Sequence, residues 1–160
     1  MAIDHAERAK ALFLEGYNCA QAVFCAFTDL TGLDMDAAAR LASSFGGGLG
    51  RLRQTCGTVS AAALVLGMLK GYADPKDPQA KKDHYALVRE FARRFTEAEG
   101  AITCRELLTR AGVDASAGGA PEARTPEYYK KRPCPMLAWR AARILDEMIG
   151  DGDQGVGNGD

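Results

Sequence analysis

The sequence lacks the CxxC pair that is typical of structural zinc sites. It also lacks the GxxxxGK(S/T) pattern of a phosphate-binding loop. Basic residues are not in excess, since 20 Lys and Arg stand against 21 Asp and Glu, for a formal net charge of −1. Binding to a phosphate backbone usually requires a basic surface, so nucleic acid is not expected as a partner.

Export and membrane signals are also missing from the sequence. Residues 1–7 show neither a basic n-region nor an apolar h-region, and the longest apolar run, 59–69, is too short to cross a bilayer. We therefore expect a cytoplasmic protein with no membrane partner. Cytoplasmic thiols are kept reduced, so the five cysteines are expected to be catalytic, metal-binding or buried rather than statically cross-linked.

Apolar residues recur at helical spacing along most of the chain, and no convincing period-two strand is present. The sequence therefore predicts an all-α fold. The length of 160 residues and a hydrophobic content of 47% suit a single compact domain of about six to seven helices over residues 1–149. A disordered tail is expected over residues 150–160, which carry little apolar surface. The predicted helices cover residues 5–15, 18–31, 34–45, 55–69, 78–99, 104–110 and 135–148.

A glycine-rich segment, 46–50, separates two of these helices. Glycine loses the most backbone entropy when it is ordered in a helix or strand, so this segment is predicted to be a tight loop. The helix that follows is apolar on nearly every side, which predicts a central, buried position. In contrast, His5, His84 and the basic run 130–132 are expected to be solvated.

Four cysteines stand where helices are predicted to begin. The first turn of a helix offers unpaired N–H groups and a partial positive charge, both of which favour a thiolate. Thr103 and Glu106 fit a capping box around one of these cysteines. Cys25 lies in the middle of a predicted helix and is expected to be a small core residue. The four cysteines at predicted helix starts are Cys19, Cys56, Cys104 and Cys134.

One helix end contributes about 0.3–1 kcal/mol to an adjacent charge, whereas one pKa unit corresponds to about 1.36 kcal/mol. A single helix end therefore barely lowers the pKa of a thiol to neutral pH, and several helix ends must converge on the site to do so. Arg51, Arg53 and Arg105 could add to the field. Four uncompensated thiolates in a core would be too costly, so the cysteines must be protonated, paired as disulfides or neutralised by metal. An iron–sulfur site and a thiol–disulfide pair stay open, with zinc less favoured.

The motifs around these cysteines resemble the C_GCAxxG_C_C family of redox-active proteins over roughly residues 5–148. Two residues of the central motif depart from the family pattern, since Thr58 replaces an alanine and Ala61 replaces a glycine, but neither change removes a sulfur. The resemblance implies that the four named cysteines are the family's four and that Cys25 is not among them. The matching segments are GYNCAQAV, FGGGLG, CGTVSA, CRELL and the cysteine of RPCP.

The family is similar to the iron–sulfur portion of split-Soret cytochromes, so the resemblance favours a [2Fe–2S] cluster bound by Cys19, Cys56, Cys104 and Cys134 for electron transfer or redox sensing. No haem-attaching CxxCH occurs in this sequence. Backbone N–H groups near the cluster would tune it. The glycines expected to approach the cluster are Gly47, Gly48, Gly50 and Gly57.

Two alternatives accompany this hypothesis. In the first, the protein is a thiol–disulfide protein without metal, in which Cys19 or Cys56 is the reactive, catalytic thiolate and another of the four cysteines resolves it. In the second, it is a zinc-stabilised interaction module. A redox partner is expected for the cluster protein, and a homodimer is expected as its assembly.

Overall fold

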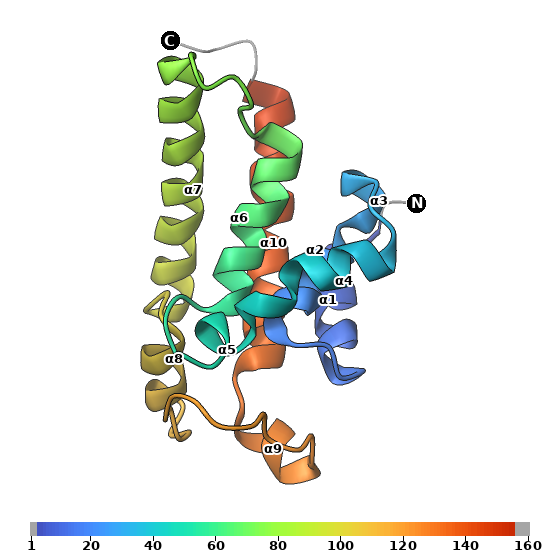
Figure 1. Cartoon of the computed structure of the whole chain (residues 1–160), viewed down its shortest axis with the longest axis vertical. Helices are drawn as coiled ribbons and strands as arrows, with labels where there is room; N and C mark the ends of the chain where they lie inside the picture. Colours follow the sequence, from blue (N-terminus) through green and yellow to red (C-terminus); the bar gives the residue numbers. More distant parts are fainter. Residues whose placement is uncertain (1–2, 156–160) are drawn as a thin grey trace.

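The computed structural model describes the backbone of residues 3–155 and the side chains of residues 3–150 (Figure 1). Over this range the fold is all-α, as predicted, and its only β feature is an isolated bridge between Thr55 and Thr103. The predicted helices are all present, and short elements lie between them. In chain order the elements are α1 (His5–Leu14), α2 (Cys19–Ala26), α3 (Thr28–Thr31), α4 (Met35–Ala42), the 3₁₀ helix η1 (Ser43–Phe45), α5 (Gly46–Leu49), α6 (Gly57–Lys70), α7 (Pro78–Glu99), α8 (Cys104–Arg110), α9 (Pro126–Lys131) and α10 (Cys134–Gly155).

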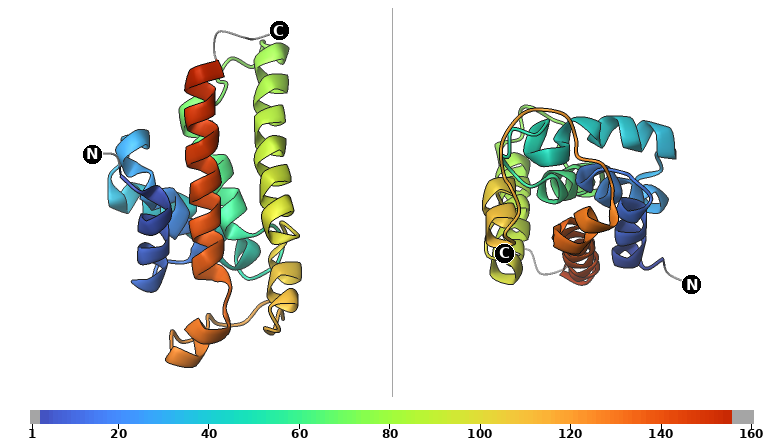
Figure 2. Two further views of the ribbon diagram at one scale, coloured as in Figure 1. Left: turned by 180° about the vertical axis from the view of Figure 1, so that it is seen from behind. Right: turned by 90° about the horizontal axis from the view of Figure 1, so that it is seen from below.

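Helix α10 runs through the middle of the domain, between α1 on one side and α7 on the other (Figure 2). It also contacts α2 and α6, and α2 in turn packs against α1, α4 and α6. Fully buried alanines allow these helices to approach closely, and phenylalanines fill the remaining space. The largest fully buried side chains include Phe13, Phe24, Phe27, Phe91 and Phe95.

Local signals in the sequence explain where several helices begin. Asn18 and Gln21 form a complete capping box at α2, in which each side chain bonds the backbone N–H of the other residue. Asp34 caps α4, and Asp77 caps α7 directly before Pro78. The α2 cap fixes the entry of Cys19 into its helix, which matters for the site described below.

The C-terminal helix ends later than expected from the sequence. We placed a domain boundary at residue 149, whereas α10 continues to Gly155. Each residue added to a helix that is already anchored gains one backbone hydrogen bond, and the buried Leu145 and Met148 anchor this one. The rest of the expected tail, residues 156–160, lies outside the described residues. No helix within the described part is long and apolar enough to cross a membrane.

His5 is buried, although the sequence suggested a solvated side chain. Its Nδ1 lies 2.7 Å from Asp146 Oδ1 of α10, and its Nε2 lies 2.9 Å from Asp29 Oδ1 of α3. The imidazole ring stacks on Phe27 with a centroid distance of 4.2 Å. Burial raises the pKa of Asp146 more than the neighbouring imidazole lowers it. The histidine therefore connects the start of α1 to α3 and α10. Helical periodicity in the sequence does not predict a tertiary contact of this kind.

Replacing His5 with alanine is expected to lower the free energy of unfolding by about 2–3 kcal/mol, because it leaves two carboxylates without their shared partner. Urea unfolding of both variants gives the comparison. The control is His84→Ala on α7, where a half-buried ring contacts Tyr72, and it should cost less than about 1 kcal/mol. Equal losses in the two variants would contradict the structural role of His5.

Candidate functional site

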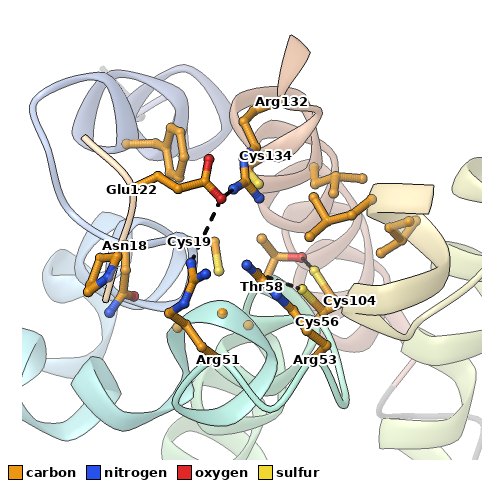
Figure 3. A pocket seen from close by; sticks show the side chains of 18 of the residues that line it. Asn18, Cys19, Arg51, Arg53, Cys56, Thr58, Cys104, Glu122, Arg132 and Cys134 are labelled. Carbon is orange, nitrogen blue, oxygen red and sulfur yellow. Dashed lines mark hydrogen bonds and ion pairs between the residues drawn. The ribbon is translucent and has the colours of Figure 1, made fainter. Parts of the chain in front are cut away.

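Four cysteines from distant parts of the chain line one cavity of about 350 Å³ (Figure 3). Cys56 is buried, and the other three are half-buried at the cavity wall. Cys25 lies in the hydrophobic core on α2 instead, as expected. The fold thus brings together sulfurs whose positions in the sequence run from 19 to 134. The cavity cysteines are Cys19, Cys56, Cys104 and Cys134.

Three of these cysteines are the first residues of α2, α8 and α10, and Cys56 immediately precedes α6. The predicted capping box at Thr103 is wrong, because the Thr103 hydroxyl is buried and makes no hydrogen bond. Instead, the N–H groups of Cys104 and Arg105 donate to the carbonyls of Gln54 and Arg53, at 2.6 and 3.3 Å. These hydrogen bonds satisfy the first backbone N–H groups of α8 and connect Cys104 to the segment that precedes Cys56.

The glycine-rich segment forms a left-handed turn, labelled α5. Residues 47–51 all have positive φ, between 54° and 70°. A Cβ atom added at Gly48 would lie 2.6 Å from the Cβ of Cys104, and one added at Gly57 would lie 2.5 Å from the Sγ of Cys19. Glycine is therefore required at both positions by close approach to the cysteines. Of the four glycines expected near the site, Gly47, Gly50 and Gly57 line the cavity, whereas Gly48 is not among its lining residues.

Burial governs the protonation of the cavity thiols. Burial and the neighbouring Cys19 thiol raise the pKa of Cys56 to about 12, with a smaller contribution from Cys104, while Thr58 acts in the lowering direction. Burial and the other thiols also raise the pKa of Cys134. For Cys19 burial again dominates, while backbone N–H groups of Gly47, Ala20 and Gly57 act in the lowering direction. At Cys19, Cys56 and Cys134, burial therefore outweighs the favourable field of the helix starts.

Arginines surround the cysteines. Glu122 accepts from Arg132 and lies 3.9 Å from Arg51, so one carboxylate bridges two guanidinium groups (Figure 3). Arg132, expected on the solvated surface, is buried and lies over the Tyr128 ring at 4.8 Å. Of the three arginines expected near the cysteines, Arg51 and Arg53 line the cavity, whereas Arg105 is exposed on α8.

Other cavity residues were not anticipated from the sequence. Arg124 donates to the carbonyls of Phe13 and Tyr17, both at 3.0 Å, and its guanidinium covers the Phe13 ring. No local pattern in the loop over residues 113–125 predicts this position, because the partners of Arg124 lie near the other end of the sequence. The side chains of Leu107, Leu108 and Leu137 supply the apolar part of the wall.

All five cysteines are free thiols. Within the described residues, no three Cys, His, Asp or Glu side chains are gathered closely enough to hold one metal ion. The cavity therefore presents sulfur donors from several sides without a preformed centre for a single ion.

Residues 17–148 match the family described as "Putative redox-active protein (C_GCAxxG_C_C)". The chain belongs to this family. The match confirms the membership expected from the motifs, and it spans all four cavity cysteines. Neither the curated proteins nor the solved structures contain a match to the chain. The family description supports redox activity in general and names no cofactor. The geometry of the site is therefore the basis for proposing one.

The close approach at Gly48 gives a direct test of the site's architecture. Gly48→Ala should destabilise the protein by at least 2 kcal/mol more than Gly112→Ala, an estimate on the order of the cost of overpacking. Both glycines have positive φ, but a Cβ at Gly112 meets no atom within 4 Å. Urea unfolding measures the difference. Equal effects of the two substitutions would show that the turn does not press against Cys104.

The raised thiol pKa values predict alkaline instability of the reduced, metal-free protein. Because the pKa of Cys56 is about 12 in the folded state against 9.0 as its ordinary value, its contribution to stability is complete below pH 9 and is lost as the pH rises toward 12. Cys56→Ser should reduce the loss by up to about 1.4 kcal/mol per pH unit in that window. Urea unfolding between pH 8 and 10.5 under argon measures the slope, and an unchanged slope would contradict the shift.

Proposed function

We propose that Cys19, Cys56, Cys104 and Cys134 bind an iron–sulfur cluster of the [2Fe–2S] type, and that the protein serves in electron transfer or redox sensing. The observation that carries this proposal is the convergence of four thiols from four elements on one cavity. Four cysteine thiolates are the usual ligand set of such clusters. Redox activity of the family agrees with this use of the site.

The residues around the thiols fit such a group. Gly48 and Gly57 have no Cβ atom, which would collide with Cys104 and Cys19. The backbone at these glycines can therefore lie directly against the two cysteines. The cavity also holds a buried guanidinium nitrogen, Arg53 Nη2, that has no hydrogen-bond partner. A cationic wall suits a group that carries excess negative charge from its thiolates.

The thiol–disulfide alternative is less well supported by the electrostatics. A reactive thiolate requires a lowered pKa, whereas the pKa of Cys56 is raised to about 12 and that of Cys19 is also raised. Coordination removes this obstacle, because a metal replaces the thiol proton and offsets the charge.

A single zinc ion also fits less well than a cluster. Tetrahedral zinc requires sulfurs at about 2.3 Å from one centre, and no three candidate ligands among the described residues are gathered in that way. A cluster with two irons is held by thiolates that lie farther apart, so four sulfurs spread over the cavity wall suit it better.

A bound cluster would take up and release one electron at a time. The chain would contribute the four ligands and the surrounding groups that set the reduction potential of the cluster. N–H groups of Gly47, Ala20 and Gly57 are directed at Cys19 and stabilise negative charge on its sulfur. Leu107, Leu108 and Leu137 exclude water from the cavity.

Anaerobic reconstitution with iron and sulfide should yield a brown protein with about two irons and about two sulfides per chain. Serine substitution of any one of the four cavity cysteines should reduce the iron content and the visible absorbance. Iron analysis, sulfide analysis and absorbance spectra measure this outcome.

The matched control is Cys25→Ala, which removes a cysteine of the core on α2 and should leave the cluster in place. Colourless protein with stoichiometric zinc would contradict the proposal. So would protein that takes up no iron but loses its thiol titre reversibly under mild oxidant.

A further inference from the structure

We propose that Arg53 is the counter-charge of the negatively charged group held by the four cysteines and raises the reduction potential of that group. This inference rests on the proposed cluster function and assigns a tuning role to one residue of its surroundings. Its support comes from the side-chain contacts, the burial and the backbone conformation of Arg53.

Arg53 places a guanidinium group directly against the sulfur site. Its Nη1 donates to Cys104 Sγ at 3.6 Å, and its Nε donates to the carbonyl of Ser116 at 3.2 Å. The residue is only 4% exposed. Its Nη2 is buried and has no hydrogen-bond partner. The guanidinium is therefore fixed beside a cysteine with part of its hydrogen-bonding capacity unused.

The other cavity arginines differ from Arg53 in their partners. Arg51 and Arg132 share the carboxylate of Glu122, and Arg124 donates to two backbone carbonyls. Among the described residues, no carboxylate forms an ion pair with Arg53, although its charge, after the hydrogen bonds from Ser116, helps to lower the pKa of the exposed Asp114 carboxyl. An isolated buried charge is costly unless a charge of opposite sign lies near it. The four cysteines are the nearby groups that acquire negative charge when they act as ligands.

The backbone of Arg53 is also held in an uncommon conformation. Its φ is +60°, in the left-handed region that non-glycine residues rarely occupy. Its N–H donates to the carbonyl of Gly47 at 3.2 Å, which closes the left-handed turn and sets the direction of the side chain. Strained backbone of this kind persists where the surrounding structure requires it, and such positions cluster at functional sites.

Reduction adds negative charge to the bound group, so a nearby cation favours the reduced state. Arg53→Met should therefore lower the reduction potential of the reconstituted protein, and Arg53→Lys should lower it less because lysine keeps the charge. The control is Arg105→Met, which removes an exposed arginine next to Cys104 and should leave the potential unchanged. Spectroelectrochemical titration measures all four proteins.

A second measurement uses the reduced, cluster-free protein and so does not depend on the cluster. Arg53→Met and Arg53→Lys both lose the bond to Ser116, but only the lysine variant keeps a buried cation that has no ion-pair partner. The methionine variant should therefore melt about 2–4 °C higher than the lysine variant, the shift that roughly 1 kcal/mol produces in a chain of this size. Loading the cluster should reverse the order of the two melting temperatures.

The outcomes separate this inference from the proposed function. An unchanged potential together with a more stable lysine variant in the cluster-free protein would overturn the role of Arg53. If the wild-type protein binds no cluster but the methionine variant is the more stable, the buried uncompensated charge is supported and the cluster is not. If sulfate then raises the melting temperature of wild type and not of Arg53→Met, the counter-ion is a free oxyanion, and the assignment to a cysteine-bound group is overturned.

Discussion

Close approach of the backbone to two cysteine side chains, at the left-handed turn and at the start of α6, is the constraint on which the site depends. Only glycine fits at positions 48 and 57, because a Cβ atom there would overlap Cys104 and Cys19. The same turn bonds to the segment just beyond it, since Gln54 N–H donates to the Gly48 carbonyl. That segment then offers its own carbonyls to the first turn of α8. A chain of backbone hydrogen bonds thus connects the glycine turn to Cys104.

The buried thiols and the buried Arg53 guanidinium each carry an electrostatic cost in the cavity. Burial keeps the Cys56 and Cys134 thiols protonated by raising their pKa values, and the buried Nη2 of Arg53 has no hydrogen-bond partner. Coordination of a metal centre would relieve both costs, since the metal would replace the thiol protons, which leave to solvent, and the thiolate ligands would place negative charge beside the guanidinium. Both features support the proposal of a bound anionic centre.

The sequence predicted the parts of this structure that depend on local bonding. Helical periodicity located the helices, and the cap at the start of α2 is a local one, formed by Asn18 and Gln21. Local patterns failed where distant partners decide the outcome. Thr103 does not cap α8 because residues 53 and 54, far away in sequence, satisfy its first N–H groups. Arg132 is buried for a different reason, since its partners Glu122 and Tyr128 are close to it in sequence but a basic run does not indicate such contacts.

Convergence of the sulfurs was a hypothesis from sequence, and the family resemblance supplied the identity of the four cysteines before the fold placed them around one cavity. The most direct test of the account is the anomalous scattering of iron in crystals of the reconstituted protein. The account predicts one iron-containing peak in the cavity, bonded to Cys19, Cys56, Cys104 and Cys134 at about 2.3 Å, a length typical of metal–thiolate bonds. Absence of iron from the cavity, or a peak ligated by other residues, would contradict it.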